Sequence, residues 1–192
     1  LSTYRLAVAV NGQYTVFHRG TKQLALVAIN NTLTGLNFIF ETDLGIKLEL
    51  VDNNDEIVYL DSDTDPFEDT IDDNTNAVLQ STIDSVIGSS NYDIGHLFSG
   101  TGGGGNAGAI GSVCSASTKG SAWSASGSPR GNSFVNLVAH EMGHQIGANH
   151  TFSFNSEGTG VNVEPASGST IMSYAGTGAD DMASYADNYY HN

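Results

Sequence analysis

The chain of 192 residues has little of what several classes of protein depend on. Its single cysteine, Cys114, excludes any disulfide within the chain. Only 6 Lys and Arg residues oppose 21 Asp and Glu residues, and the formal net charge of −15 argues against nucleic acid or an anionic membrane as a partner held by a basic surface. No uninterrupted apolar run of about 20 residues occurs, so we expect no segment that spans a bilayer.

The length of the chain allows a sizeable buried core. It is most simply one domain, and no internal repeat is evident. The sequence opens at Leu1 with neither an initiator methionine nor a charged segment followed by a signal-like apolar core. We therefore expect a mature or trimmed fragment.

The negative charge is concentrated in one part of the sequence. Fifteen of the 21 carboxylates lie between Glu41 and Asp93, where Lys47 is the only basic residue. This concentration predicts a solvated acidic face. The alternating aspartates of residues 61–65 suggest calcium as an alternative, because calcium takes oxygen ligands. Pro66 stands where an EF-hand loop needs glycine and Asp72 where it needs glutamate, so the calcium hypothesis is limited to some other surface site.

The spacing of apolar residues predicts alternating strands and helices. The expected strands are Leu6–Val10, Ile46–Val51, Ile57–Leu60, Tyr92–Phe98 and a short one around Trp123. The expected helices are Lys22–Phe40, one capped by Thr75 or Asn76 and ending at Ile87, one capped by Asn132 or Ser133, and a closing helix within Asp180–Asn192.

Three other features invite a functional interpretation, and we interpret each as structural. Gly100–Gly108 holds six glycines in nine residues but lacks the Gly-Lys-Ser/Thr ending of a phosphate-binding loop. Cys114 is expected to be a small buried hydrophobic residue in a strand. The remaining histidines have no ligand spacing and are interpreted as surface or hydrogen-bonded core residues: His18, His96 and His191.

The strongest signal is the segment from His140 to His150, which has the form HExxHxxGxxH. Residues four apart lie on one face of a helix, so the imidazoles of His140 and His144 can bind one metal ion. Gly147 permits a sharp turn that returns His150 as a third ligand. Three neutral imidazoles leave a position open for water, as in catalytic zinc sites. Glu141 lies beside the ligands and is the candidate general base.

A chance HExxH on an amphipathic helix is the alternative to this interpretation. In that case the histidines would only pair with their neighbours. The glycine and the third histidine at fixed offsets disfavour that alternative, because a chance match would have to place both correctly.

The motif resembles that of the metzincin metallopeptidases, whose second signature is a methionine turn after the third histidine. That turn corresponds here to Ser169–Tyr174. The resemblance implies that Met172 forms a hydrophobic floor beneath the metal without binding it. Among metzincins, the amino-terminal part looks most like the reprolysin (adamalysin) branch. The resemblance spans almost the whole chain, although only the zinc motif and Met172 are highly specific.

This resemblance implies an α/β (α+β) metzincin-like fold, with a twisted mixed sheet and two long helices above a zinc cleft. It also implies one catalytic domain, residues 1–192, with an upper subdomain of about 1–147 and a small irregular lower subdomain of about 148–192. In metzincins an edge strand pairs with the extended substrate, and its place corresponds here to Asn106, Ala107, Gly108, Ala109 and Ile110. The segment Ala175–Asp181 would help to wall the pocket on the primed side.

Two residues depart from the reprolysin pattern. Reprolysins usually have Asp directly after the third histidine, whereas this chain has Thr151-Phe152, as pappalysin-like metzincins do. Tyr174 follows Met172 by two residues, a spacing seen in astacins and serralysins. We hypothesise that Tyr174 is a switchable metal ligand or a donor to the oxyanion in the transition state. The alternative is a buried tyrosine whose hydroxyl is bonded to backbone.

Taken together, motif and resemblance predict a secreted, acidic zinc endopeptidase that acts on protein or peptide substrates. We expect one catalytic Zn²⁺, a monomer, and a propeptide that inhibits the zymogen before maturation. A catalytically silent adhesive or matrix module stabilised by zinc is the alternative from another class. Glu141 counts against it, because a purely structural site needs the histidines but no adjacent base. A zinc hydrolase of other substrates is a further alternative without a supporting motif.

Overall fold

The computed structural model describes residues 1–155, 157–176, 181–183 and 186–190. A sheet of five strands, in the order β2-β1-β3-β5-β4, forms its centre. The strands are Ser2–Val10 (β1), Ile46–Leu50 (β2), Ile94–Ser99 (β3), Gly103–Asn106 (β4) and Ala122–Ser126 (β5). All neighbours are parallel except β4, which is antiparallel to β5 at one edge. The predicted mixed sheet is thus confirmed.

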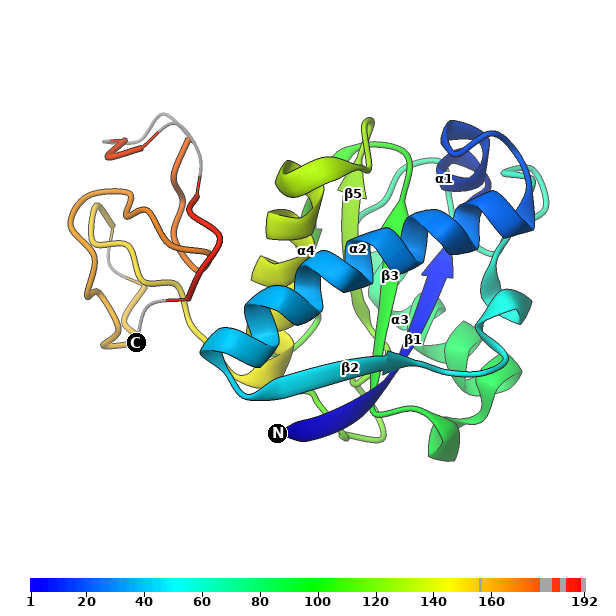
Figure 1. Cartoon of the computed structure of the whole chain (residues 1–192), viewed down its shortest axis with the longest axis horizontal. Coiled ribbons are helices and arrows are strands. Elements are labelled where there is room, and N and C mark those ends of the chain that lie inside the picture. Colours follow the sequence, from blue (N-terminus) through cyan, green and yellow to red (C-terminus); the bar gives the residue numbers. More distant parts are fainter. Residues whose placement is uncertain (156, 177–180, 184–185, 191–192) are drawn as a thin grey trace.

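Helices cover both faces of this sheet. They are Gly12–Phe17 (α1), Lys22–Asp43 (α2), Asn74–Ile83 (α3) and Gly131–Ile146 (α4), with shorter helical turns at Asn54–Ile57, Asp84–Gly88 and Ser89–Asn91. Figure 1 shows the two long helices, α2 and α4, on one face and α3 on the other. The pair of long helices expected for the fold is therefore present.

The core follows from the alternation of side chains along β1. Leu6, Val8 and Val10 point into the apolar cluster beneath α2 and α4. Ala7 and Ala9 point into a second cluster, which α3 closes. From Leu6 to Val10 both faces of the strand are fully buried, which explains why this part of its sequence is a continuous apolar run.

Helix α2 has the length and the mean hydropathy, 1.2, of a segment that could cross a membrane. The sequence predicted a helix here, Lys22–Phe40, but no candidate membrane span, because Asn30, Asn31 and Thr32 interrupt the apolar run. The helix packs into the core through Ile29, Leu36 and further residues, and 39% of its apolar window is buried. Core helices pass the same test of length and composition, so α2 does not establish a membrane span.

The expected strand Ile57–Leu60 is wrong. Asn54–Ile57 forms a 3₁₀ turn, and Val58 makes only an isolated bridge with Val10. The reason is the side chain of Asn54, which accepts a hydrogen bond from the N–H of Val8 at 2.7 Å and donates one to its carbonyl at 2.9 Å. A buried side-chain amide thus takes the place of a strand partner along this part of β1.

Several other local predictions need correction. Cys114 is exposed in a turn with a φ of 61° and does not lie in a buried strand. α4 begins one or two residues before the expected caps and has no side-chain cap, because Arg130 is the residue that precedes it. α3 begins at Asn74 and passes into a π turn that ends at Gly88.

The chain after α4 lies beside the sheet and its helices as irregular loops, drawn in yellow to red in Figure 1. The described residues of Asp180–Asn192 form no helix, contrary to prediction, and Tyr185 and His191 lie outside them. Tyr190 nevertheless packs under α4, and its hydroxyl donates to the carbonyl of Ala139 at 2.5 Å. The division into two subdomains at about residue 147 stays a prediction.

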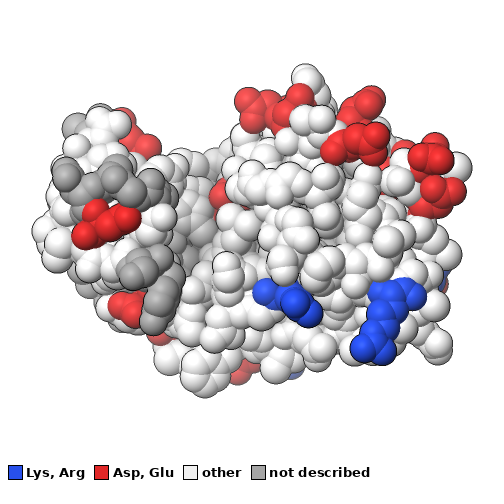
Figure 2. Space-filling view, turned by 90° about the horizontal axis from the view of Figure 1, so that it is seen from above, with Lys and Arg blue, Asp and Glu red and all other residues white. Residues whose placement is uncertain are grey.

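Figure 2 shows acidic side chains along the rim of the face that it displays, with the few basic side chains in separate places. Asp61, Asp63, Glu68 and Asp69 are exposed, as a solvated acidic face requires. Asp65 is partly buried and accepts hydrogen bonds from the N–H groups of Gly12 and Phe67. That carboxylate therefore fixes the start of α1.

Candidate metal centre

Two of the predicted ligands come from adjacent turns of α4. The helix buries Phe134, Val138 and Met142 in the core, which fixes its rotation about its own axis. His140 and His144 then lie together on the side facing the loops, with ring centroids 4.9 Å apart.

The third histidine is returned by a turn at Gly147. This residue has a φ of 120°, which only glycine adopts readily, and its N–H donates to the carbonyls of Gly143 and His144. The Nε2 atom of His150 then lies 3.2 Å from that of His140 and 3.1 Å from that of His144. Nitrogens bound to one tetrahedral zinc ion at ordinary bond lengths are about 3.3 Å apart, so the three rings fit that ion.

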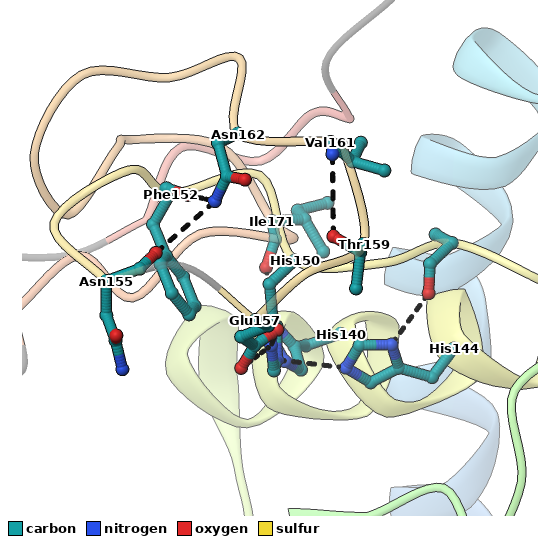
Figure 3. A network of polar contacts seen from close by, with 11 residues as sticks. His140, His144, His150, Phe152, Asn155, Glu157, Thr159, Val161, Asn162 and Ile171 are labelled. Carbon is teal, nitrogen blue, oxygen red and sulfur yellow. Dashed lines mark hydrogen bonds and ion pairs between the residues drawn. The ribbon is translucent and has the colours of Figure 1, made fainter.

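The outer nitrogen of each ring has an acceptor (Figure 3). His140 Nδ1 lies 2.7 Å from the carbonyl of Ile171, and His144 Nδ1 lies 2.7 Å from that of Ala148. A carbonyl only accepts, so each Nδ1 carries the hydrogen and each Nε2 presents its lone pair. Burial lowers the pKa of His140 to about 3 and also lowers that of His144, so both are neutral. Lone pairs that face one another repel unless a cation lies between them.

These three histidines are the only group of three or more potential His, Cys, Asp or Glu ligands within the described residues. All the ligand atoms are imidazole nitrogens, which suit zinc and not calcium. The aspartates of residues 61–65 form no such group in the described part of the chain, so the calcium hypothesis gains no support from the structure.

Glu141 lies beside the converging nitrogens and is only 7% exposed. Burial raises the pKa of its carboxyl group to about 7, whereas a bound divalent cation would favour the charged form and oppose this shift. A cavity of about 830 Å³ on one side and another of about 380 Å³ on the other both reach His140, Glu141 and Tyr174. The centre therefore lies within a cleft that continues past it in both directions.

The edge strand of the sheet passes directly over Glu141. A Cβ atom on Gly105 would lie 2.4 Å from Cγ of Glu141 and 2.6 Å from its Oε1. The glycine-rich composition of this strand thus has a local cause at one position. The strand is Gly103–Asn106, so the prediction of Asn106 to Ile110 is three residues late, and Ala107 to Ile110 lie in the turn that follows.

The methionine turn, Ser169–Tyr174, packs against α4. Met172 is 2% exposed, and its Sδ atom would lie 2.5 Å from a Cβ atom on Gly143. Gly143 is one of the two variable positions of the HExxH motif, and its lack of a side chain admits the methionine sulfur. The carbonyl of Ile171 in the same turn is the acceptor for His140.

A carboxylate that sequence reasoning missed organises the loops. Glu164 is 6% exposed and accepts hydrogen bonds from the hydroxyls of Thr151 and Thr170 and from the N–H groups of Ser169 and Thr170. Burial alone would raise the pKa of Glu164, but these four donors hold it below its ordinary value. Glu164 thereby joins the residue after the third histidine to the methionine turn.

Tyr174 lies against the third histidine. Its ring centroid is 4.5 Å from that of His150 and 4.6 Å from that of Phe152, and Phe154 stacks on Phe152. Burial raises the pKa of the Tyr174 hydroxyl, as do the charges of Glu157 and Glu141. Within the described residues this hydroxyl has no hydrogen-bond partner, so the backbone contact of the alternative interpretation is not seen there.

A buried pair fixes the back of α4 to the sheet. His96 is fully buried between the side chain of Gln145, at 3.0 Å, and that of Ser124, at 2.9 Å. Burial lowers the pKa of His96 to about 4, so the ring is neutral. The prediction of a surface or hydrogen-bonded core histidine is confirmed for His96, which is a hydrogen-bonded core residue. Gln145 lies inside the motif, but nothing in the local sequence indicates its partner.

The comparisons with known proteins point to one family. The sequence model of the family described as Metallo-peptidase family M12B Reprolysin-like matches residues 1–192. A solved structure described as "Structure of a chaperone-substrate complex" is similar over 100% of this chain and 29% of its own, with 15% identity and a TM-score of 0.58, which shows the fold alone. No curated protein matches the sequence. Because the family match covers every residue, the chain belongs to the reprolysin-like metallopeptidases of family M12B.

Proposed function

We propose that this protein is a zinc endopeptidase that hydrolyses peptide bonds of proteins. The observation that carries the proposal is the buried carboxylate of Glu141 beside three converging neutral imidazoles, inside a cleft that continues on both sides. A structural metal site would need neither the carboxylate nor the cleft.

The proposed chemistry divides between the metal and the chain. A zinc ion held by His140, His144 and His150 would polarise the scissile carbonyl and lower the pKa of the attacking water. Glu141 accepts a proton from that water while the oxygen of the water bonds to the carbonyl carbon. The same carboxyl group then gives the proton to the leaving amine as the C–N bond breaks. The products are a carboxylic acid and an amine, and Glu141 is regenerated.

The substrate is proposed to bind in extended form along β4. One side of this strand pairs with β5, and the other is the open edge of the sheet. Gly103, Gly104 and Gly105 have no side chains that would shield their backbone groups from a peptide strand. Pairing of backbone with backbone would hold many sequences across the centre, as a protein substrate requires.

Hydrolysis of denatured casein or of a quenched mixed-peptide library tests this function. We expect activity in the protein loaded with zinc, loss of activity after removal of the metal by a chelator, and its return when zinc is added back. A protein that binds about one zinc per chain yet cleaves no peptide would contradict the proposal and favour the silent adhesive or matrix module.

Tyr174 is proposed to donate a hydrogen bond to the developing oxyanion, a role that its position beside His150 supports. Replacing Tyr174 by phenylalanine should lower kcat roughly 10- to 150-fold with little change in KM, because a hydrogen bond to a charged group is worth about 1.5–3 kcal/mol. Steady-state kinetics at matched zinc content measure the effect. Unchanged kcat would show that the hydroxyl has only a structural role.

Family membership favours an extracellular location, and we extend the proposal accordingly. The enzyme is secreted as a zymogen whose propeptide inhibits it, and it acts as a monomer. The net charge of −15 is compatible with such a location because it keeps the chain dissolved.

A further inference from the structure

The outer partner of the third ligand differs in kind from those of the other two. His140 and His144 each contact a backbone carbonyl, as described above, whereas His150 Nδ1 lies 2.9 Å and 3.0 Å from the two carboxylate oxygens of Glu157. Within the described residues, Glu157 is the only charged group in contact with an outer nitrogen of the ligand set. Figure 3 shows its side chain directed at the His150 ring.

The loop that carries Glu157 is held at its two ends. The N–H groups of Ser153 and Phe154 donate to the carbonyl of Ala166. Beyond Glu157, the side chain of Asn162 donates to the carbonyl of Phe152 at 2.8 Å and to that of Asn155 at 3.3 Å (Figure 3). These contacts close the loop on itself, so the tip that bears Glu157 returns over the ring of His150.

Burial of the ring sets this contact apart from the other ion pairs among the described residues. The side chain of His150 is 15% exposed, compared with 49%, 43% and 41% for the basic partners Arg5, Lys22 and Lys47. The imidazole also has to keep one tautomer and one orientation to bind a metal, which a lysine does not. A partner of Nδ1 on a metal ligand therefore acts on the metal as well as on the ring.

We propose that Glu157 is a positioning residue for the metal centre: its carboxylate holds the third ligand in the metal-binding tautomer and orientation and strengthens it as a donor. The other two rings are fixed by α4 and by backbone that the fold places nearby. His150 follows the turn at Gly147 and belongs to no regular element, so its orientation depends on a side chain from the following loop. This inference rests on the metal binding of the proposed function, but not on its catalysis.

Zinc affinity measured by competition with a chromophoric chelator at fixed pH tests the role of Glu157. Replacing Glu157 by alanine should weaken zinc binding about 10- to 100-fold. Glu157→Gln offers an amide oxygen to the same N–H without the charge and should lose less. The absorption spectrum of the protein loaded with cobalt(II) should change with alanine more than with glutamine, because it reports the geometry of the ligands. Glu49→Ala, which removes an exposed carboxylate far from the centre, should leave affinity and spectrum unchanged.

Zinc affinity within twofold of the unmodified protein in both Glu157 variants would overturn the inference. Glutamine has nearly the same shape as glutamate, so that variant decides the matter if the alanine variant folds poorly. A protein whose zinc affinity depends on Glu157 but which cleaves no peptide would refute the proposed catalysis and leave this inference standing. An active protein whose zinc affinity does not depend on Glu157 would refute this inference and leave the proposed catalysis standing.

Discussion

Replacing Glu141 by alanine is expected to lower kcat for peptide hydrolysis about 10²- to 10⁴-fold while the protein still binds about one zinc ion per chain. The three Nε2 atoms that converge belong to His140, His144 and His150, so the metal keeps its ligands when the carboxylate is removed. The water then loses the group that accepts its proton, and the leaving amine loses its donor. General acid–base catalysis typically contributes about 10²- to 10⁴-fold, and the loss should lie in kcat and not in KM.

Zinc content, kcat and KM should be measured on the same preparations of this variant. Glu68→Ala is the matched control, because Glu68 is an exposed glutamate of the acidic face. His144→Ala serves as a second comparison and should lose the metal together with the activity. Hydrolysis by Glu141→Ala at more than a tenth of the normal rate, with zinc bound, would show that another group is the base.

The second large effect is expected from Gly105→Ala, a change of one methyl group in the edge strand. That methyl group would lie within 2.6 Å of Cγ, Cδ and Oε1 of Glu141, closer than any real contact, so the carboxylate must move. Gly105 does not have a positive φ, so alanine brings no backbone strain of its own. A displacement of about 1 Å at a reacting group can cost roughly 100-fold, and we expect kcat to fall by about that factor at unchanged zinc content.

The control for this variant is Gly127→Ala. Gly127 lies just beyond β5, also lacks a positive φ, and has open space where its Cβ atom would be. It should retain full activity and stability. Full activity of Gly105→Ala would mean that the strand yields in place of the base, and the proposed coupling between β4 and Glu141 would be wrong.

Much of the candidate site could be predicted because its spacing is local. His140 and His144 lie on one helix, and the turn at Gly147 brings His150 back toward them. The geometry of a few neighbouring residues therefore determines that the three imidazole rings converge. The buried part of β1, Leu6–Val10, could be predicted equally well, because its apolar run reflects burial on both faces. Such features depend on neighbours in sequence, which a single chain displays directly.

The remainder depends on contacts between distant residues that have no local pattern. Glu164 reads as one more acidic residue, yet it holds Thr151 and Thr170 together in the loops. Asn54 gives no sign that it will replace a strand partner for Val8. The edge strand was placed three residues late because glycines carry no alternation of apolar and polar side chains, and its register with β5 fixes it instead.

The two edge strands of the sheet, β2 and β4, are protected from pairing with other molecules in different ways. An open strand edge can pair with a strand from another molecule, which is how aggregation begins. β2 carries charged side chains that disfavour such pairing, because Lys47 and Glu49 form an ion pair on this strand. β4 has no charged residue and, at Gly105, no room for a side chain, because Glu141 fills that space. Its protection has to come from its length of four residues, too short to seed a growing sheet, and from the mutual repulsion of molecules that each carry a net charge of −15.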